Sequence, residues 1–332
     1  MRSDQLHRRQ FITLLGGAAA VWPLAARAQQ AAMPVIGFLS SLASRDLNLV
    51  VPPFHEGLNS AGFVEGRNIG VEYRWAEGDY QRLPTLSADL VHRKVVVIAA
   101  ISGTPAVLAA KAATTTIPIV FAIGGDPVAP GLVPNLSRPG GNATGVSFYS
   151  ALVVTKRLDL AREMIGKGST IGMLVNPDNP PSVAEGKAVQ DAGAAFGQPV
   201  EIFHAGTQRQ LDEAFATIVQ QRIGALLVSP DPFFLNERAK LVVLTARHAL
   251  PTIFGDREQV EAGNLMSYGA SRRDAYRQAG SYAGRIVRGE KPAELPVMLP
   301  TKFDLVINLK TAKSLRIDIP GTVLARADEV IE

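Results

Sequence analysis

The sequence has no cysteine, few aromatic residues and few charges. Of its 332 residues, 6% are aromatic and 19% are charged, whereas 47% are hydrophobic. The absence of thiols excludes disulfide-stapled scaffolds and zinc or iron–sulfur sites held by cysteine. The high apolar content excludes a chain that is disordered throughout. The length fits two domains of ordinary size.

The formal net charge of +4 is unevenly distributed. Residues 1–28 hold four of the 34 basic residues and one of the 30 acidic residues, so the remainder carries a net charge of +1. A nearly neutral body does not support a nucleic-acid-binding surface. We therefore expect no nucleic-acid partner.

The first 28 residues have the regions of an export signal in the required order. The pair Arg8-Arg9 precedes a weakly apolar stretch at residues 11–21, and a small-x-small cleavage site ends at Ala28. The paired arginines favour the twin-arginine route. The alternative is a membrane anchor, but the stretch is shorter than the ~18–20 residues of a span and a proline follows it closely. We expect cleavage after Ala28 and a mature protein in the periplasm.

Short runs rich in valine and isoleucine alternate with longer amphipathic stretches. Apolar runs of this kind indicate strands buried on both faces, and apolar residues at i, i+3, i+4 and i+7 indicate helices. The predicted strands are 35–39, 69–73, 95–100, 117–122, 171–175, 200–203, 225–228 and 252–254; the predicted helices are 80–93, 104–114, 183–196, 208–222 and 236–248. This alternation predicts α/β architecture with parallel sheets and helices on both faces.

The second half of the pattern resembles the first. Residues 36–39 match residues 171–174, and the other strands match at an offset of about 130 residues; chance similarity between any two βαβ units is the alternative. Residues 265–332 add a strand at 265–268, a helix at 272–288 and a strand pair around 297–309. Such extra elements suit a chain that crosses between two lobes, with a ligand cleft between them.

These elements divide into a signal and two lobes. We expect lobe 1 to comprise residues 33–146 plus 269–296, and lobe 2 to comprise residues 147–268 plus 297–332.

Local motifs along the whole chain carry a family resemblance. They lie at residues 8–20, 73–78, 111–121, 124–127, 138–147, 262–269 and 300–313. In these motifs the chain resembles the solute-binding components of ABC transporters, in a large proteobacterial family whose best-understood relatives take up aromatic amino acids such as tryptophan. The resemblance implies a type I periplasmic-binding fold: two Rossmann-like lobes, three hinge crossings and a small solute between them. It also implies an ABC permease of the inner membrane as partner.

Polar and aromatic residues follow the predicted strands, where ligands bind in open parallel sheets. Hydroxyl groups at a helix N-terminus suit a carboxylate, and Thr104 is the strongest candidate. Aspartates in the same loops suit an ammonium group, and aromatic rings suit a side-chain pocket. The candidate ligand-binding residues are Ser40, Ser41, Ser102, Thr104, Asp126, Phe148, Asn176, Asp231, Phe233, Asp256 and Tyr268, with Tyr149 and Phe234 as further pocket candidates.

Each candidate has a purely structural alternative. Ser40, Ser102 and Asn176 are residue types that cap helices, and Asp126 and Asp231 each precede a proline in a turn-like sequence. The aromatic residues suit core or hinge packing equally well.

Catalysis has little support in the sequence. Beyond the signal the histidines are His55, His92, His204 and His248, and none has the spacing of a zinc protease. Neither a nucleophile elbow nor a nucleotide-binding glycine motif is complete. We therefore expect a monomeric, non-catalytic solute-binding protein without metal or cofactor. The alternatives are a periplasmic sensory module and, less in keeping with the export signal, a two-lobe transcriptional repressor.

Overall fold

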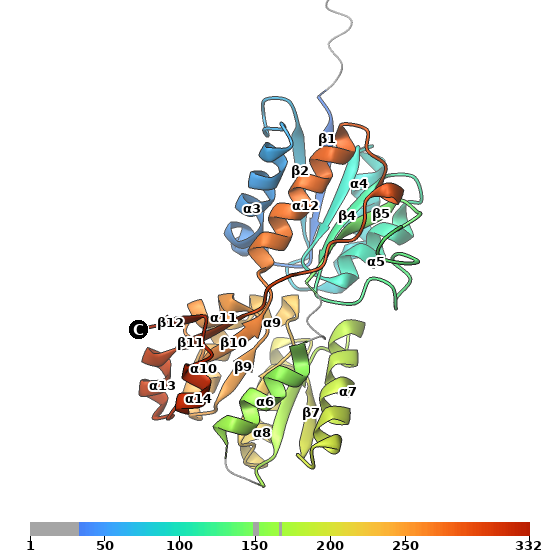
Figure 1. Cartoon of the computed structure of the whole chain (residues 1–332). Helices are drawn as coiled ribbons and strands as arrows, with labels where there is room; N and C mark the ends of the chain where they lie inside the picture. Colours follow the sequence, from blue (N-terminus) through green and yellow to red (C-terminus); the bar gives the residue numbers. More distant parts are fainter. Residues whose placement is uncertain (1–32, 149–152, 166–167) are drawn as a thin grey trace, which may run out of the picture. The chain divides into compact units, whose positions relative to one another are not determined.

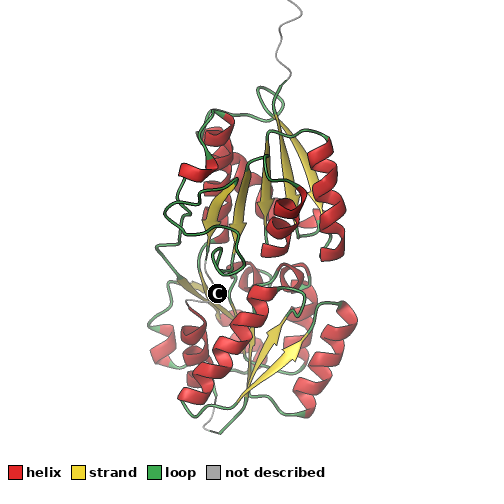
Figure 2. Cartoon of the chain, turned by 90° about the vertical axis from the view of Figure 1, so that its right-hand side faces the viewer, coloured by secondary structure: helices red, strands yellow, loops and turns green. Residues whose placement is uncertain are grey.

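Two β-sheets organise the chain, and helices cover both faces of each (Figures 1 and 2). The computed structural model describes residues 33–148, 153–165 and 168–332. The expected signal, its cleavage site and Tyr149 lie outside the described residues. Residues Val35–Glu332 form one compact unit. We call the first sheet with its helices lobe 1 and the second sheet with its helices lobe 2.

Lobe 1 is built on a five-stranded parallel sheet in the order β2-β1-β3-β4-β5. The four predicted strands are confirmed to within about two residues at each end. The fifth strand was missed because its sequence, Ala-Thr-Gly-Val-Ser, contains no apolar run. The strands are β1 (Val35–Ser40), β2 (Gly70–Trp75), β3 (Val97–Ile101), β4 (Ile119–Ile123) and β5 (Ala143–Ser147).

Alternate residues of these strands face two different helix layers, as the strand period of two requires. Phe38 packs with α3 (Leu47–Ser60) and α12 (Arg272–Val287), and its neighbour Leu39 packs with α4 (Leu83–His92) and α5 (Thr104–Ala113). Three short 3-10 helices complete the lobe: η1 (Ser44–Asp46), η2 (Tyr80–Arg82) and η4 (Pro292–Glu294). Helix α3 was not predicted, because two adjacent prolines lie inside it.

Lobe 2 contains a seven-stranded sheet in the order β12-β11-β10-β9-β8-β6-β7. Its sheet is parallel except where β10 meets β11. Its strands are β6 (Ile171–Val175), β7 (Val200–His204), β8 (Ala225–Val228), β9 (Thr252–Phe254), β10 (Met266–Gly269), β11 (Asp304–Asn308) and β12 (Glu329–Ile331); its helices are α6 (Val154–Met164), α7 (Pro180–Ala195), α8 (Gln208–Gln220), α9 (Pro232–Asn236), α10 (Arg238–Arg247), α11 (Arg257–Glu261), α13 (Leu309–Leu315) and α14 (Gly321–Leu324).

The C-terminal part differs from its prediction. The expected strand pair around residues 297–309 is wrong, because that segment contains only β11. Met298 instead forms an isolated parallel bridge with Val146 of β5. The strands that flank β11 are β10 and β12. The short strand β12 was missed because it is only three residues long and half exposed.

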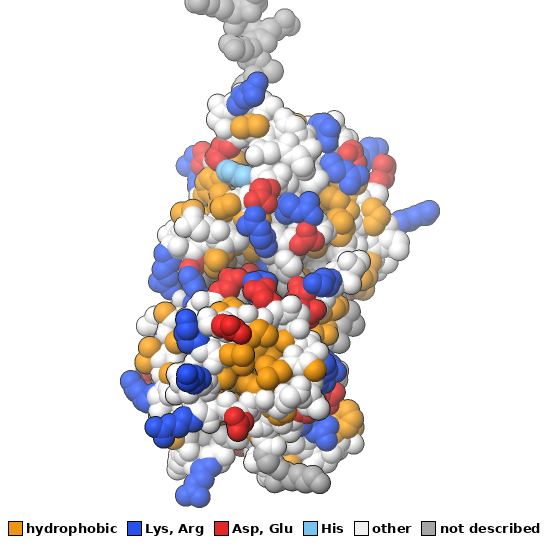
Figure 3. All heavy atoms as spheres, turned by 60° about the vertical axis from the view of Figure 1, so that its left-hand side comes forward, with side chains coloured by type: hydrophobic (Ala, Val, Ile, Leu, Met, Phe, Trp, Pro, Cys, Tyr) orange, Lys and Arg blue, Asp and Glu red, His pale blue; other side chains and the backbone are white. Residues whose placement is uncertain are grey.

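The chain changes lobe three times: after β5, after β10 and after η4. The exact residues at which the lobes divide stay predictions. Within the described ranges, no helix is long and apolar enough to cross a membrane. Basic and acidic side chains are intermixed on the face shown in Figure 3, as expected for a nearly neutral body.

Helices α3 and α12 lie side by side in contact through their backbones (Figure 1). A Cβ atom at Gly280 would lie 1.9 Å from the carbonyl oxygen of Phe54, and one at Gly57 would lie 1.7 Å from that of Arg277. Any side chain at either position would therefore force the two helices apart.

We expect Gly280→Ala to lower the free energy of unfolding by about 1–3 kcal/mol, because the added methyl group overpacks this interface. Gly321→Ala is the matched control, since a Cβ atom there meets nothing within 4 Å. Urea unfolding measures both variants. Equal stability of the two would contradict the close packing of α3 against α12.

Candidate functional site

A small polar cavity lies where the carboxyl ends of the strands of the two lobes meet. Its volume is only about 20 Å³. Its walls come from the loops after β3, β4, β5, β6 and β8 and from the N-terminal parts of α5, α7, α9 and α12. They are Gly103, Thr104, Gly124, Gly125, Phe148, Asn179, Pro181, Ser182, Glu185, Ser229, Pro230, Pro232 and Arg272.

Arg272 brings a buried positive charge to this cavity. It begins α12 directly after the second lobe crossing and is only 3% exposed. Its Nε donates to Oδ1 of Asp256 at 2.6 Å, and its guanidinium carbon lies 5.2 Å from the centre of the Phe148 ring. Its Nη2 is buried and makes no well-formed hydrogen bond among the described residues, although the Tyr276 hydroxyl lies near the guanidinium. A buried charged donor without a partner is costly, so this nitrogen is suited to an anionic ligand group.

Asn179 brings the opposite chemistry from lobe 2. It stands directly before α7 and is 5% exposed. Its Nδ2 donates to Oδ2 of Asp231 at 2.6 Å, and this carboxylate fixes the amide orientation because it can only accept. Oδ1 is therefore directed elsewhere, and it is buried without a partner in the described part of the chain. It is suited to accept a hydrogen bond from a ligand.

The Glu185 carboxylate, also in the cavity wall, is already neutralised by its neighbours. It forms a buried ion pair with Arg157 and accepts from the Ser229 hydroxyl at 2.6 Å. These contacts hold the base of α7 against β8. The wall is therefore rigid there, and the ligand-directed groups are those of Arg272 and Asn179.

A larger apolar hollow adjoins the polar cavity. Its volume is about 270 Å³, and it shares Gly124, Gly125 and Pro181 with the polar cavity. Its remaining walls are Asp126, Ala129, Pro130, Pro180 and Ala184.

Gly125 lies at the neck between the two spaces. A Cβ atom there would lie 2.6 Å from the ring of Pro181 and 3.2 Å from the hydroxyl oxygen of Thr104. Residue 125 therefore has no room for a side chain at the point where the two spaces adjoin.

A third hollow, of about 350 Å³, is lined by residues of both lobes and is strongly acidic. Four carboxylates line it without any lysine or arginine: Glu77, Asp79, Asp178 and Glu237. Across the described ranges, no group of three or more histidine, aspartate or glutamate residues is arranged to hold a metal ion.

Asp231 lies between the polar cavity and the acidic hollow. Burial raises the pKa of its carboxyl group, while hydrogen bonds to the carboxylate pull the pKa back down. Its donors are Asn176 Nδ2 at 3.0 Å, Asn179 Nδ2 at 2.6 Å, Tyr80 OH at 2.9 Å and Phe233 N at 2.8 Å. The carboxylate is therefore saturated by protein donors, which leaves little capacity for the ligand contact expected from sequence.

Two of the predicted residues, Thr104 and Phe148, line the polar cavity. Asn176 and Phe233 line the acidic hollow instead. Asp126 lines the apolar hollow, where its carboxylate accepts from Val128 N in the turn given as its alternative.

The other predicted residues lie behind the cavity or away from it. Asp256 acts through Arg272. Ser102 donates to Tyr276 OH at 2.9 Å, and Ser40 accepts from Leu42 N at 3.2 Å. Ser41 is buried. None of the hollows described above includes Ser40, Ser41, Ser102 or Asp256 in its walls.

Tyr268 does not line the polar cavity, and it lies in β10 opposite Leu305 of β11. Its ring lies 6.4 Å from that of Phe303, and both line a separate hollow of lobe 2. Phe234 is buried in the lobe 2 core, as its structural alternative stated.

The helix-cap alternative for Ser40, Ser102 and Asn176 is not what these side chains do. None of the three is the N-cap of a described helix. Asn176 Oδ1 accepts from Asp178 N in a turn, and Asp231, a predicted ligand residue, caps α9.

Sequence reasoning missed Arg272 and Asn179. In the sequence, Arg272 is one of two adjacent arginines at the start of a helix, and nothing distinguishes it from the exposed Arg273. The only available signal for Asn179 was its place in the loop after β6, which was inspected for its neighbour Asn176.

Comparison with known proteins agrees with this architecture. The sequence model of the ABC transporter substrate binding protein family matches residues 35–331. A tyrosine-binding protein of Clostridioides difficile (strain R20291) is 27% identical over 280 residues, which is 84% of this chain and 80% of that relative. Solved periplasmic binding proteins with under 25% identity share the fold.

Two solved structures are similar over most of the chain. An ABC domain from Streptococcus pneumonia in complex with L-Trp has a TM-score of 0.82 and 26% identity, covering 90% of this chain and all of that one. A ligand-free, open substrate-binding protein from Clostridium difficile has a TM-score of 0.63 and 26% identity, covering 90% of this chain and 99% of that one. These findings confirm the family and the type I fold expected from sequence. The chain belongs to the ABC transporter substrate-binding protein family.

Proposed function

We propose that this protein binds a free amino acid with an apolar or aromatic side chain and delivers it to an ABC permease. The observation that carries the proposal is the pair of buried, unpartnered atoms on one cavity: a cationic donor, Arg272 Nη2, and a neutral acceptor, Asn179 Oδ1. An α-amino acid offers the complementary pair, a carboxylate and an ammonium group, on one carbon atom.

The carboxylate binds Arg272, beside the N-terminus of α5 at Thr104. The free N–H groups of that ten-residue helix add to the positive potential. The ammonium group donates to Asn179 Oδ1. Backbone atoms alone fill the small polar cavity, and the side chain passes Gly125 into the apolar hollow.

Two findings on relatives support an amino acid. One relative is a tyrosine-binding protein, and the Streptococcus pneumonia structure holds L-Trp.

Such a ligand favours the closed form because its two charged groups bind different lobes. Arg272 belongs to a lobe 1 helix, and Asn179 begins a lobe 2 helix. A ligand drives closure only through its extra affinity for the closed state. Bridging both lobes supplies that difference. The protein acts in this role as a monomer, without catalysis.

The first prediction concerns the carboxylate. With L-tryptophan and L-tyrosine as probes, calorimetry on the mature protein should give tight binding of the free amino acids and at least tenfold weaker binding of their amides. Arg272→Lys keeps a charge beside Asp256 but loses the guanidinium fork, so it should weaken binding of the free amino acids by about 1.5–3 kcal/mol. It should bring the acid and the amide closer in affinity.

Thr144→Val is the matched control, because Thr144 is buried in β5 and its hydroxyl bonds to Leu295 O away from the cavity. An unchanged acid-to-amide ratio in Arg272→Lys would remove Arg272 from the site.

The second prediction concerns pH. Burial raises the pKa of Glu258 to about 7, with Asp256 and Glu261 adding to the rise and Arg272 opposing it. Above pH 7 the ionised Glu258 places a second carboxylate near Arg272, so ligand affinity should fall several-fold between pH 6 and pH 8.5. The pKa of Glu258 in the folded protein exceeds its usual value of about 4.5, so the folded protein binds the proton more tightly than the unfolded chain. The free energy of unfolding should therefore also fall as the pH rises from about 4.5 to about 7.

Titrations at pH 6, 7 and 8.5 measure the effect. Glu258→Gln should flatten the pH profile of affinity, whereas Glu261→Gln, at an exposed carboxylate paired with Arg257, should leave it largely in place. A profile in Glu258→Gln as steep as in the unmodified protein would overturn the assignment.

We also propose that residues 1–28 direct export by the twin-arginine route and that the mature protein works in the periplasm. Changing both Arg8 and Arg9 to lysine should trap the precursor inside the cell, because that route requires the arginine pair. Cell fractionation with detection of the processed chain measures the outcome. Normal periplasmic yield of this variant would assign export to the general pathway.

A further inference from the structure

We propose that Tyr80 and Asp231 form a latch that holds the two lobes together, and that Asn179 connects this latch to the bound ligand. The inference rests on the proposed function for the ligand's ammonium group. It gives Tyr80, which does not line the polar cavity, a part in retaining the ligand.

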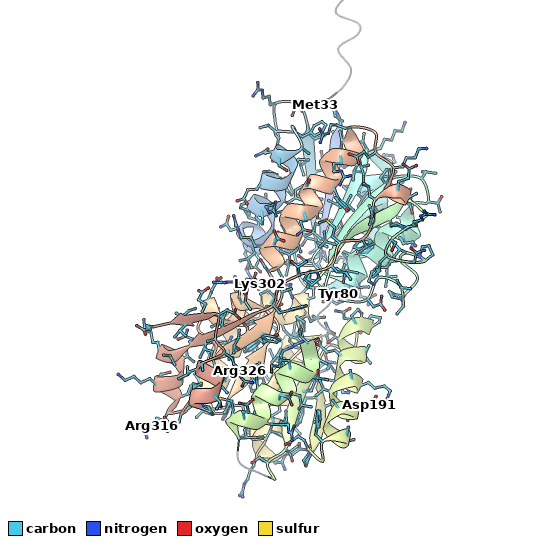
Figure 4. All side chains as sticks on the ribbon, in the orientation of Figure 1. Met33, Tyr80, Asp191, Lys302, Arg316 and Arg326 are labelled. Atoms are coloured by element: carbon cyan, nitrogen blue, oxygen red, sulfur yellow. The ribbon has the colours of Figure 1, made fainter. Side chains whose placement is uncertain are left out.

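The latch crosses from one lobe to the other. Tyr80 lies in η2, just after β2 of lobe 1, and its side chain is labelled in Figure 4. Its hydroxyl donates to Oδ1 of Asp231, the N-cap of α9 in lobe 2, at 2.9 Å. Burial and the neighbouring carboxylate raise the pKa of Tyr80, so its hydroxyl stays protonated and donates.

Asn179 links the latch to the cavity through one amide group. Its Nδ2 donates to the second oxygen of Asp231, and its Oδ1, buried without a partner in the described part of the chain, belongs to a residue of the cavity wall and is the atom proposed to bind the ammonium group. A flipped amide would set Oδ1 against the Asp231 carboxylate and the NH₂ group against the ligand's ammonium. Ligand and latch therefore favour the same orientation of Asn179, which is the condition for positive coupling between them.

Other contacts between the lobes in this region lack that connection. Ala43 N donates to Asn236 Oδ1 at 3.0 Å, and Arg238 pairs with Asp46 at 2.6 Å. Leu235 packs into the lobe 1 core. None of these residues lines the polar cavity. They stabilise the closed form whether or not a ligand is present, whereas the Tyr80 contact responds to the ligand through Asn179.

The test compares Tyr80→Phe with Tyr73→Phe. The control also loses a phenolic hydroxyl, but one that bonds to His55 and Glu65 within lobe 1. With L-tryptophan as probe in stopped-flow fluorescence, Tyr80→Phe should release ligand about tenfold faster, with little change in association rate. Tyr73→Phe should match the unmodified protein.

A double-mutant cycle tests the role of Asn179. In an Asn179→Ala background, Tyr80→Phe should accelerate dissociation by a clearly smaller factor than in the unmodified protein, because the part of its effect that passes through Asn179 is already lost. Equal rates in Tyr80→Phe and Tyr73→Phe, or fully additive effects in the cycle, would overturn the latch.

A distance measurement keeps the latch separate from the ligand proposal. Since the chain contains no cysteine, Asn59→Cys in lobe 1 and Asp191→Cys in lobe 2 accept spin labels at two exposed positions only. Without ligand, Tyr80→Phe should shift the label distances toward a more open population, and Tyr73→Phe should not. If neither L-tryptophan nor L-tyrosine binds, the proposed function fails, and the latch is then tested by the label distances alone. An unchanged distance distribution in Tyr80→Phe would overturn the latch.

Discussion

The buried guanidinium of Arg272 is the constraint on which the cleft depends. A cation at the first residue of a helix opposes the helix dipole, and burial adds a desolvation cost. Asp256 offsets part of this cost from the loop after β9, so the ion pair joins lobe 2 to a lobe 1 helix beside the second crossing. Phe148 covers the guanidinium near the first crossing. One charge therefore ties two of the three crossings to the wall of the cavity.

The cavity gains its chemistry because this charge is incompletely satisfied. Asp256 occupies Nε, and the buried Nη2 of this cavity-lining residue is left without a hydrogen-bond partner among the described residues. Asn179 has the complementary deficit, because its Oδ1 is a buried acceptor without a donor among the described residues. Protein interiors pair nearly all of their buried polar groups, so two unpaired atoms of complementary character on one small cavity indicate a missing partner. The binding of that partner repays a cost already present in the folded protein.

The fold was largely predictable because buried parallel strands leave a strong trace in the sequence. Runs such as residues 97–101 and 119–123 are wholly apolar, since both of their faces are covered by helices. Strand β5 escaped detection because Gly145 packs directly on the Phe121 backbone, where a Cβ atom would lie 2.1 Å from its carbonyl oxygen. The close contact selects a small residue, and a small residue carries no hydrophobic signal.

The site was predictable only in its location. The rule that ligands lie beyond strand ends led to Thr104 and Phe148, which line the polar cavity. It could not separate Asn176 from Asn179, three residues apart in one loop, because their roles depend on which hydrogen bonds each amide already makes. Asn176 has its amide bonded to Asp231 and its oxygen bonded to Asp178 N, whereas Asn179 has an oxygen left over. Residual hydrogen-bonding capacity is a property of the assembled structure, and no local pattern encodes it.

The division into a polar cavity and an apolar hollow separates two tasks that a binding protein must perform. In the proposed binding mode, Arg272 and Asn179 contact the groups common to all amino acids, and they lie on elements beside the lobe crossings and the proposed latch. The walls of the hollow come from the exposed turn after β4 and the first turn of α7, through residues such as Ala129, Pro130 and Ala184. Changes in these residues alter the volume and polarity available to the side chain without disturbing the charge pair or the latch. Affinity for the common groups and preference among side chains can therefore vary independently on one fold.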